Sequence, residues 1–182
     1  EIGGNVRIGN SSYFLAEACE FSGSFLEMHP YIAVILNIDN DHLDYFKDMD
    51  HIYKAFLDFA HLVPEGGFVV GCADDPLVDK LLDELKCNVI RYSIGGKGDW
   101  VADEIKYDSM GCPTFHAVYQ GQDMGWFSLH VPGKHNVYNA LASIAVAWIT
   151  GISRDVICKA LASYRGTHRR FEIKGKVKGV TI

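Results

Sequence analysis

The stretch YIAVILNIDNDHLDYF, residues 31–46, decides the fold. Its first half, residues 31–38, is a continuous apolar run, which predicts a strand buried on both faces of a parallel sheet. Its second half becomes polar abruptly, with Asp39, Asp41, His42 and Asp44. Ligands of open α/β sheets bind outside the carboxyl ends of the strands, so this change indicates a functional site.

The segments after this stretch alternate between helix and strand. Apolar residues recur at helical spacing over 49–62, and Pro64, Gly66 and Gly67 then end the pattern. The elements predicted next are a strand over 67–73, a helix over 75–85 with Pro76 in its first turn, and a strand over 88–94. This order is typical of βαβ units.

The pattern changes after residue 100. Alternating runs joined by glycine-rich turns occupy 100–131, and GQDMG (121–125) between two of them predicts a hairpin. A helix is predicted over 136–149, ended by Gly151. We therefore predict an α/β fold, with a mostly parallel sheet flanked by helices and an added antiparallel strand portion.

Three further elements complete the expected fold. SYFLAEA (12–18) predicts a short strand that leads into an acidic turn. Ser153 is expected to cap a second helix that runs to about Tyr164. The closing segment 171–182 alternates like a strand.

Length and composition exclude several classes of protein. The chain has 182 residues, 48 % of them hydrophobic, which suits one globular domain. Its net charge of −6 and thinly spread basic residues argue against a nucleic-acid partner. No apolar window is long enough to suggest a membrane span. The five cysteines lack any CxxC, so we expect small core residues in a reducing cytosol, with neither a disulfide framework nor a zinc knuckle.

Two predicted strand ends are acidic. Glu17 lies at the end of the strand predicted over 12–18 and Glu20 just after it, and NIDNDHLD (37–44) begins at the end of the strand predicted over 31–38. Carboxylate oxygens, together with water and phosphate oxygens, suit Mg²⁺. Either cluster alone could be a solvated loop, but the pair indicates a metal site.

Two other segments suit a nucleotide. In PGKHNVYN (132–139), Gly133 precedes a helix start, where free N–H groups favour an anion. Asn136 and Asn139 share one helix face and can read a base or ribose, although Asn136 could simply cap the helix. In RGTHRRFE (165–172), Arg169 and Arg170 could clamp phosphate or form a solvated basic turn. No GxxxxGK[ST] loop is present, and SIGGKGDW (93–100) predicts a turn.

Three segments together resemble the Mur ligases of peptidoglycan synthesis, and within them the central, ATP-binding domain. The segments are AEACEFSGSFLEMHPYIAVILNIDNDHLDYF (16–46), GKHNVYNALASIAVA (133–147) and YRGTHRRFEIKG (164–175). SFLEMHP (24–30) is similar to the alanine-adding branch. Branches that add later residues usually carry a carbamylated lysine some fifteen positions after the metal histidine. Here Leu57 stands at that spacing and Lys54 at twelve, so no such lysine is assigned.

The resemblance implies roles for individual residues. Glu17 would hold the Mg²⁺ that bridges the ATP phosphates, and His42 would lie at a second Mg²⁺ near the substrate carboxylate. Asn136 and Asn139 would flank the base and ribose of ATP, with His135 beside them. The resemblance also implies that Arg170 lies near the nucleotide and the domain junction, and that Glu20 and Asp44 support the metal sites.

The resemblance also implies a reaction in the bacterial cytoplasm, with no nucleic-acid or membrane partner. ATP would phosphorylate the lactyl carboxylate of UDP-N-acetylmuramate, and L-alanine would then attack the acyl phosphate. Residues 1–182 would be a truncated central domain. The phosphate loop and a uridine-binding domain would precede it, and an amino-acid-binding domain would follow. We therefore expect the chain alone to be inactive in ligation.

Three alternatives remain open at this point. The chain could be a non-catalytic nucleotide-binding module on the same scaffold, or part of a Mur ligase that adds another amino acid or peptide. A metal-dependent hydrolase that uses His42 and the nearby aspartates is the third, and it leaves GKHNVYN unexplained. The sequence does not decide the oligomeric state.

Overall fold

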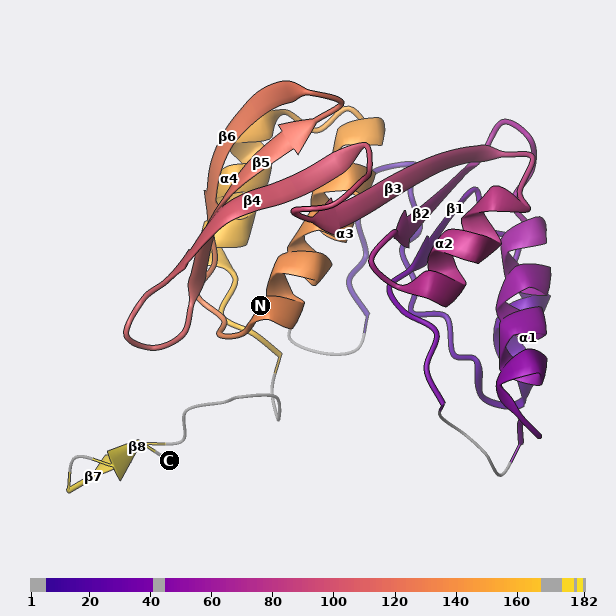
Figure 1. Ribbon diagram of the computed structural model, residues 1–182, viewed down its shortest axis with the longest axis horizontal. Helices are drawn as coiled ribbons and strands as arrows, with labels where there is room; N and C mark the ends of the chain where they lie inside the picture. The colour runs from indigo at the N-terminus through magenta and orange to yellow at the C-terminus, as the bar shows by residue number, and fades with distance from the viewer. Residues whose placement is uncertain (1–5, 41–44, 168–174, 179, 182) are drawn as a thin grey trace.

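The computed structural model describes residues 6–40, 45–167, 175–178 and 180–181. Its centre is a six-stranded sheet in which the strands follow one another in chain order (Figure 1). The strands are β1 (Ile32–Ile35), β2 (Phe68–Cys72), β3 (Asn88–Ile94), β4 (Trp100–Tyr107), β5 (Pro113–Tyr119) and β6 (Gln122–Ser128). A separate two-stranded sheet joins β7 (Lys176–Val177) to β8 (Val180–Thr181).

The six-stranded sheet has a parallel and an antiparallel half. Strands β1, β2 and β3 pair in parallel, and the start of β4 also pairs in parallel with β3, Trp100 lying opposite Tyr92. Strands β4, β5 and β6 then pair as antiparallel neighbours. This arrangement confirms the predicted fold class.

Among the residues that the structure describes, four α-helices and one 3₁₀ helix accompany the sheet. They are η1 (Phe21–Glu27), α1 (Met49–His61), α2 (Pro76–Asp83), α3 (Lys134–Ile149) and α4 (Arg154–Ser163). Figure 1 shows α1 and α2 beside the parallel strands, α3 near the middle of the sheet and α4 toward the antiparallel half. None of the helices in the described part of the chain combines the length and apolar content that crossing a membrane requires.

Two apolar cores lie on opposite faces of the sheet, because successive strand residues point to opposite sides. Val69 belongs to the core that α1, α2 and η1 cover, whereas its neighbour Val70 belongs to the core that α3 covers. Helix α3 is apolar around much of its circumference, and Leu141 and Ile144 in its middle are fully buried. The helix is thus held firmly against the sheet.

Local sequence explains where the helices begin. The side chain of Asp48 accepts a hydrogen bond from His51 N at 2.8 Å and caps α1. Pro76 occupies the first turn of α2, where its missing N–H costs nothing. Gly151 follows α3 with a φ of +79°, as its predicted role as a helix stop requires.

The predicted strand over 12–18 is wrong. No strand forms there, and the side chains of Phe14 and Leu15 are each 93 % exposed. A strand requires a hydrogen-bonded neighbour, and the residues described here pair β1 with β2 alone. The strand predicted over 31–38 is shorter than expected and buried on one face only, since Val34 and Leu36 are about 40 % exposed.

Smaller differences concern caps and turns. The β5–β6 turn lies at Gln120 and Gly121, both with positive φ, so most of GQDMG belongs to β6. Ser153 precedes α4 as expected, but its side chain makes no capping hydrogen bond. Cys19 is exposed and was wrongly predicted to be a core residue. Half of the predicted strand over 171–182 lies outside the described residues, and the described half forms the two short strands β7 and β8.

Candidate functional site

The loop that follows β2 connects the carboxyl ends of the parallel strands. Asp75 Oδ1 accepts hydrogen bonds from Leu77 N and Val78 N, both at 2.9 Å, and so caps α2. Its Oδ2 accepts from Ile38 N at 3.3 Å, just beyond β1. One carboxylate therefore fixes the exit of β1 beside the start of α2.

The neighbouring Asp74 connects this loop to α3. Its Oδ2 accepts a hydrogen bond from Ile94 N at 2.7 Å and one from the Tyr138 hydroxyl at 3.0 Å. Burial, followed by the hydrogen bond to Asp74, raises the pKa of Tyr138 to about 12. The start of α3 thus lies beside the carboxyl ends of β2 and β3, where open α/β sheets bind ligands.

The first turn of α3 depends on Gly133. This residue has a φ of +100°, and a Cβ built on it would lie 2.7 Å from Cε1 of the His135 ring. Asn136 Nδ2 donates to Pro132 O at 2.8 Å, and Asn139 Nδ2 lies 3.4 Å from Asn136 Oδ1. The predicted residues His135, Asn136 and Asn139 are therefore brought together at one helix start.

The β4–β5 loop supports this helix start from another direction. Gly133 N donates to Gly111 O at 3.0 Å. The loop is shaped by Asp108, whose Oδ1 accepts from Met110 N at 2.8 Å and Cys112 N at 2.9 Å. A loop of the antiparallel half thus contacts the residue that opens α3.

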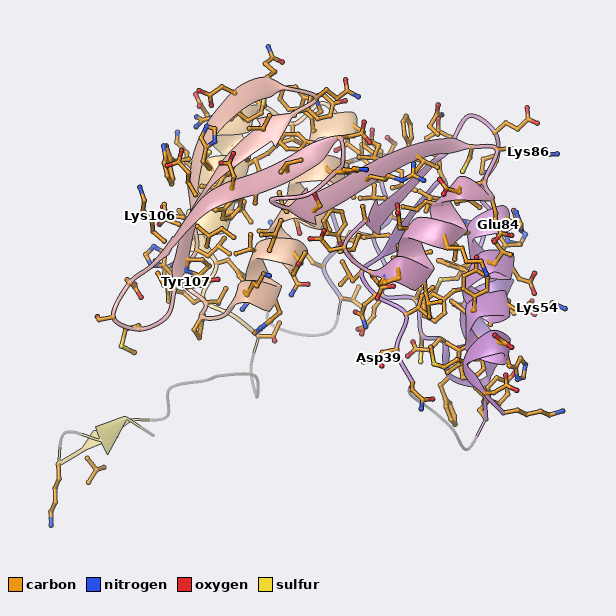
Figure 2. The ribbon with its side chains drawn as sticks, viewed as in Figure 1. Asp39, Lys54, Glu84, Lys86, Lys106 and Tyr107 are labelled. Carbon is orange, nitrogen blue, oxygen red and sulfur yellow. The ribbon has the colours of Figure 1, made fainter. Side chains whose placement is uncertain are left out.

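A pocket of about 350 Å³ lies at the carboxyl end of β1. Its polar lining comes from Glu20, Asn37, Asp39 and Asn40, and its apolar lining from Phe46, Ile52 and Phe56. Figure 2 shows Asp39 on the segment that connects β1 to α1. The pocket thus combines carboxylate and amide oxygens with aromatic and aliphatic side chains in one lining.

The predicted metal residues are only partly observable. Glu17 is exposed in the segment before η1, three residues ahead of the pocket residue Glu20. His42 and Arg170 lie outside the described residues, as do Asp41, Asp44 and Arg169. Within the ranges that the structure describes, no three His, Cys, Asp or Glu side chains group to hold a metal. One or two carboxylates with water and phosphate are the usual environment of Mg²⁺, so the oxygen donors present fit that ion.

Sequence reasoning missed Asp74, Asp75 and Asp108. A signal for the first two was available, because ADD (73–75) follows the predicted strand over 67–73 just as NIDND follows the strand over 31–38. The same argument about strand ends would have selected them. No comparable local signal marks Asp108, whose relevance comes from the contact of its loop with Gly133.

Comparison with known proteins identifies close relatives. The chain is 52 % identical over 181 residues to a UDP-N-acetylmuramate–L-alanine ligase of Caldanaerobacter subterraneus and 50 % identical to one of Clostridium beijerinckii. Each alignment covers the whole chain and 39 % of the relative. The chain thus spans about two fifths of the length of these curated relatives.

Solved structures agree with this result. The UDP-N-acetylmuramate–alanine ligase of Thermotoga maritima matches 86 % of the chain, and 34 % of its own length, with a TM-score of 0.71 and 29 % identity. MurF from Acinetobacter baumannii matches 85 % of the chain and 34 % of its own, with a TM-score of 0.74 and 26 % identity. The family model described as the Mur ligase middle domain matches residues 7–147. The chain therefore belongs to the Mur ligase family, and residues 7–147 match the middle domain of that family.

Proposed function

We propose that this chain is the nucleotide- and metal-binding part of an ATP-dependent ligase that joins L-alanine to UDP-N-acetylmuramate. The observation that carries the proposal is the convergence at the carboxyl edge of the sheet. There Asp74 and Asp75 hold the ends of β1 and β3 beside the α3 turn with Asn136 and Asn139. The names of relatives at 52 % and 50 % identity support the choice of substrates.

The proposed reaction has two steps. A lactyl carboxylate oxygen of UDP-N-acetylmuramate attacks the γ-phosphorus of ATP, and ADP leaves. The amine of L-alanine then attacks the acyl carbon, a C–N bond forms, the amine loses a proton, and phosphate departs with one former carboxylate oxygen. The protein contributes mainly position and electrostatic stabilisation in such a phosphoryl transfer.

The proposed site residues fall into two groups, those that bind the nucleotide and those that bind the metal ion. Asn136 and Asn139 present amide donors and acceptors to the base and ribose, with His135 beside them, and Arg170 meets phosphate charge. Glu17 and His42 would hold Mg²⁺. When bound, Mg²⁺ neutralises charge on the phosphate oxygens.

The pocket at the end of β1 suits the region where the two substrates meet. Glu20 and Asp39 contribute carboxylates to its lining, and Phe46 and Ile52 contribute apolar side chains. The proposal places the protein in the bacterial cytoplasm, without a nucleic-acid or membrane partner. It also holds that residues 1–182 alone do not catalyse ligation, because the uridine- and amino-acid-binding domains would lie elsewhere in the protein.

The test uses the full-length protein that contains this chain. Phosphate release is followed with Mg-ATP and UDP-N-acetylmuramate, with and without L-alanine, for wild type and His42→Ala. His61→Ala is the control, because His61 is an exposed histidine at the far end of α1. We expect release that requires L-alanine, collapses in His42→Ala and persists in His61→Ala.

Other outcomes would contradict parts of the proposal. Release that does not depend on an amino acid would favour a metal-dependent hydrolase. Release with a different amino acid would place the protein in another branch of the family. An unchanged His42→Ala enzyme would remove His42 from the metal site, and nucleotide binding without any release would favour a binding module.

A further inference from the structure

One carboxylate oxygen holds the start of α3 against the sheet. Asp74 Oδ2 accepts from the backbone N–H of Ile94, at 2.7 Å, and from the hydroxyl of Tyr138, at 3.0 Å. The first donor belongs to the last residue of β3, and the second to the second turn of α3. Asp74 itself lies in the loop after β2, so three elements meet at one atom.

Tyr138 lies in α3 next to the residues that we propose to contact the nucleotide. It is the direct neighbour of Asn139 and stands two residues after Asn136, while the ammonium of Lys134 lies 5.7 Å from the centre of its ring. A helix is rigid over one turn, so fixing the hydroxyl of Tyr138 also fixes how far α3 is rotated about its own axis. That rotation sets the direction in which Asn136 and Asn139 point.

The surroundings keep Asp74 in place. A Cβ added at Gly96 would lie 3.0 Å from Asp74 Oδ1 and 3.3 Å from Ser93 Oγ, so the loop after β3 lies close to one oxygen of this carboxylate, while Asp74 as a whole is exposed. Ser93 is fully buried. The two hydrogen bonds to Oδ2 and the nearby loop after β3 therefore hold this carboxylate in one orientation.

We infer that Asp74 is a positioning residue for nucleotide binding, and that it acts through Tyr138 to orient the α3 turn with Asn136 and Asn139. The inference rests on the proposed function, because it takes this turn as the nucleotide site. Asp74 need not touch the nucleotide. Its contribution is to remove the freedom of α3 to rotate before ATP or ADP binds.

The test measures the dissociation constant of ADP by calorimetry and the KM for ATP in the full-length protein. Asp74→Ala and Tyr138→Phe each remove one side of the contact. We expect each to weaken ADP binding and raise the KM for ATP about fivefold, with kcat changed less than about twofold. The double variant should be no worse than Asp74→Ala, because Tyr138→Phe removes only a hydrogen bond that Asp74→Ala has already removed.

Asp74→Asn separates orientation from charge. Its amide oxygen can still accept from both donors, so we expect its ADP affinity to stay within about twofold of wild type. Tyr53→Phe is the matched control. It removes another tyrosine hydroxyl that donates to a carboxylate, that of Glu84, but between α1 and α2. Its ADP affinity should equal that of wild type.

The contrary results are distinct. Unchanged ADP affinity in Asp74→Ala, with a lower urea midpoint, would reduce Asp74 to a structural role and overturn the inference. Additive losses in the double variant would show that Asp74 does not act through Tyr138, and would also overturn it. Asn136→Ala reports on the proposed function separately: if it leaves ADP affinity unchanged, the nucleotide site itself is misplaced and the inference fails with it.

Discussion

Gly133 is the residue on which the start of α3 depends most directly. Gly133→Ala would place a methyl group 2.7 Å from the His135 ring on a backbone with a φ of +100°. We expect a loss of about 1–3 kcal/mol in the free energy of unfolding and weaker ADP binding, because the turn must shift. Urea denaturation and calorimetry measure both quantities.

Gly66→Ala is the matched control for this variant. Nothing lies within 4 Å of a Cβ at Gly66, and its φ is not in the left-handed region. Its stability should change by less than about 0.5 kcal/mol, and ADP binding not at all. Equal effects of the two variants would show that the start of α3 does not need a glycine.

His116 forms a second polar contact, in the antiparallel half. Its Nδ1 lies 2.9 Å from Asp103 Oδ1 and its Nε2 lies 2.8 Å from Asp123 Oδ1, so one ring joins β4, β5 and β6. The hydrogen bonds to Asp123 and Asp103 raise the pKa of His116, and the hydrogen bond from His116 lowers the pKa of Asp123. The charged form of the ring is therefore favoured in the folded protein.

This contact predicts a pH dependence of stability. Because the folded pKa of His116 is raised, its contribution is fully present below the unfolded value of about 6.5 and is lost as pH rises through the folded pKa. The contribution of Asp123 is present above its unfolded value and is lost only in stronger acid. His116→Gln should therefore cost more stability near pH 5.5 than near pH 8.5.

Urea denaturation at the two pH values measures this difference. His130→Gln, at an exposed histidine just after β6, is the control and should show no comparable difference between the two pH values. An equal cost of His116→Gln at both pH values would mean that the ring contributes by packing rather than by charge.

At the scale of elements, local patterns predicted most of the fold. The strand over 88–94 matches β3 residue for residue, and the helix over 49–62 matches α1 within one residue. The helical spacing of the apolar residues carries the second of these predictions. The strand over 12–18 failed because strand formation depends on a neighbour that a local pattern cannot supply. Likewise, one face of β1 is exposed because α3 packs mainly on β2, β3 and β4 and leaves β1 uncovered on that side.

The caps of α1 and α2 allow a comparison between elements. Asp48 supplies one capping hydrogen bond to α1, whereas Asp75 supplies two to α2 and a third to Ile38 N beyond β1. We expect Asp75→Ala to lower the free energy of unfolding by about 2 kcal/mol and Asp48→Ala by about 1 kcal/mol. Urea denaturation of both variants measures the order, and a reversed order would mean that the contact with β1 adds nothing.

At the scale of the whole molecule, the contacts that support the predicted residues of α3 were not foreseen. His135, Asn136 and Asn139 are close in the sequence and were found as a motif. The residues that support them lie more than twenty positions away in the sequence: Asp74, in the loop after β2, accepts a hydrogen bond from Tyr138, and Gly111 O accepts one from Gly133 N. Such contacts depend on the tertiary fold, so single-sequence patterns do not reveal them.

The most direct test of the proposed ligase follows one oxygen atom through the reaction. UDP-N-acetylmuramate labelled with ¹⁸O in its lactyl carboxylate is incubated with Mg-ATP, L-alanine and the full-length protein, and the released phosphate is analysed by mass spectrometry. An acyl-phosphate route predicts one ¹⁸O in each phosphate, because the carboxylate oxygen leaves with the phosphoryl group. Unlabelled phosphate would mean that water attacks ATP, and would contradict the proposed ligation.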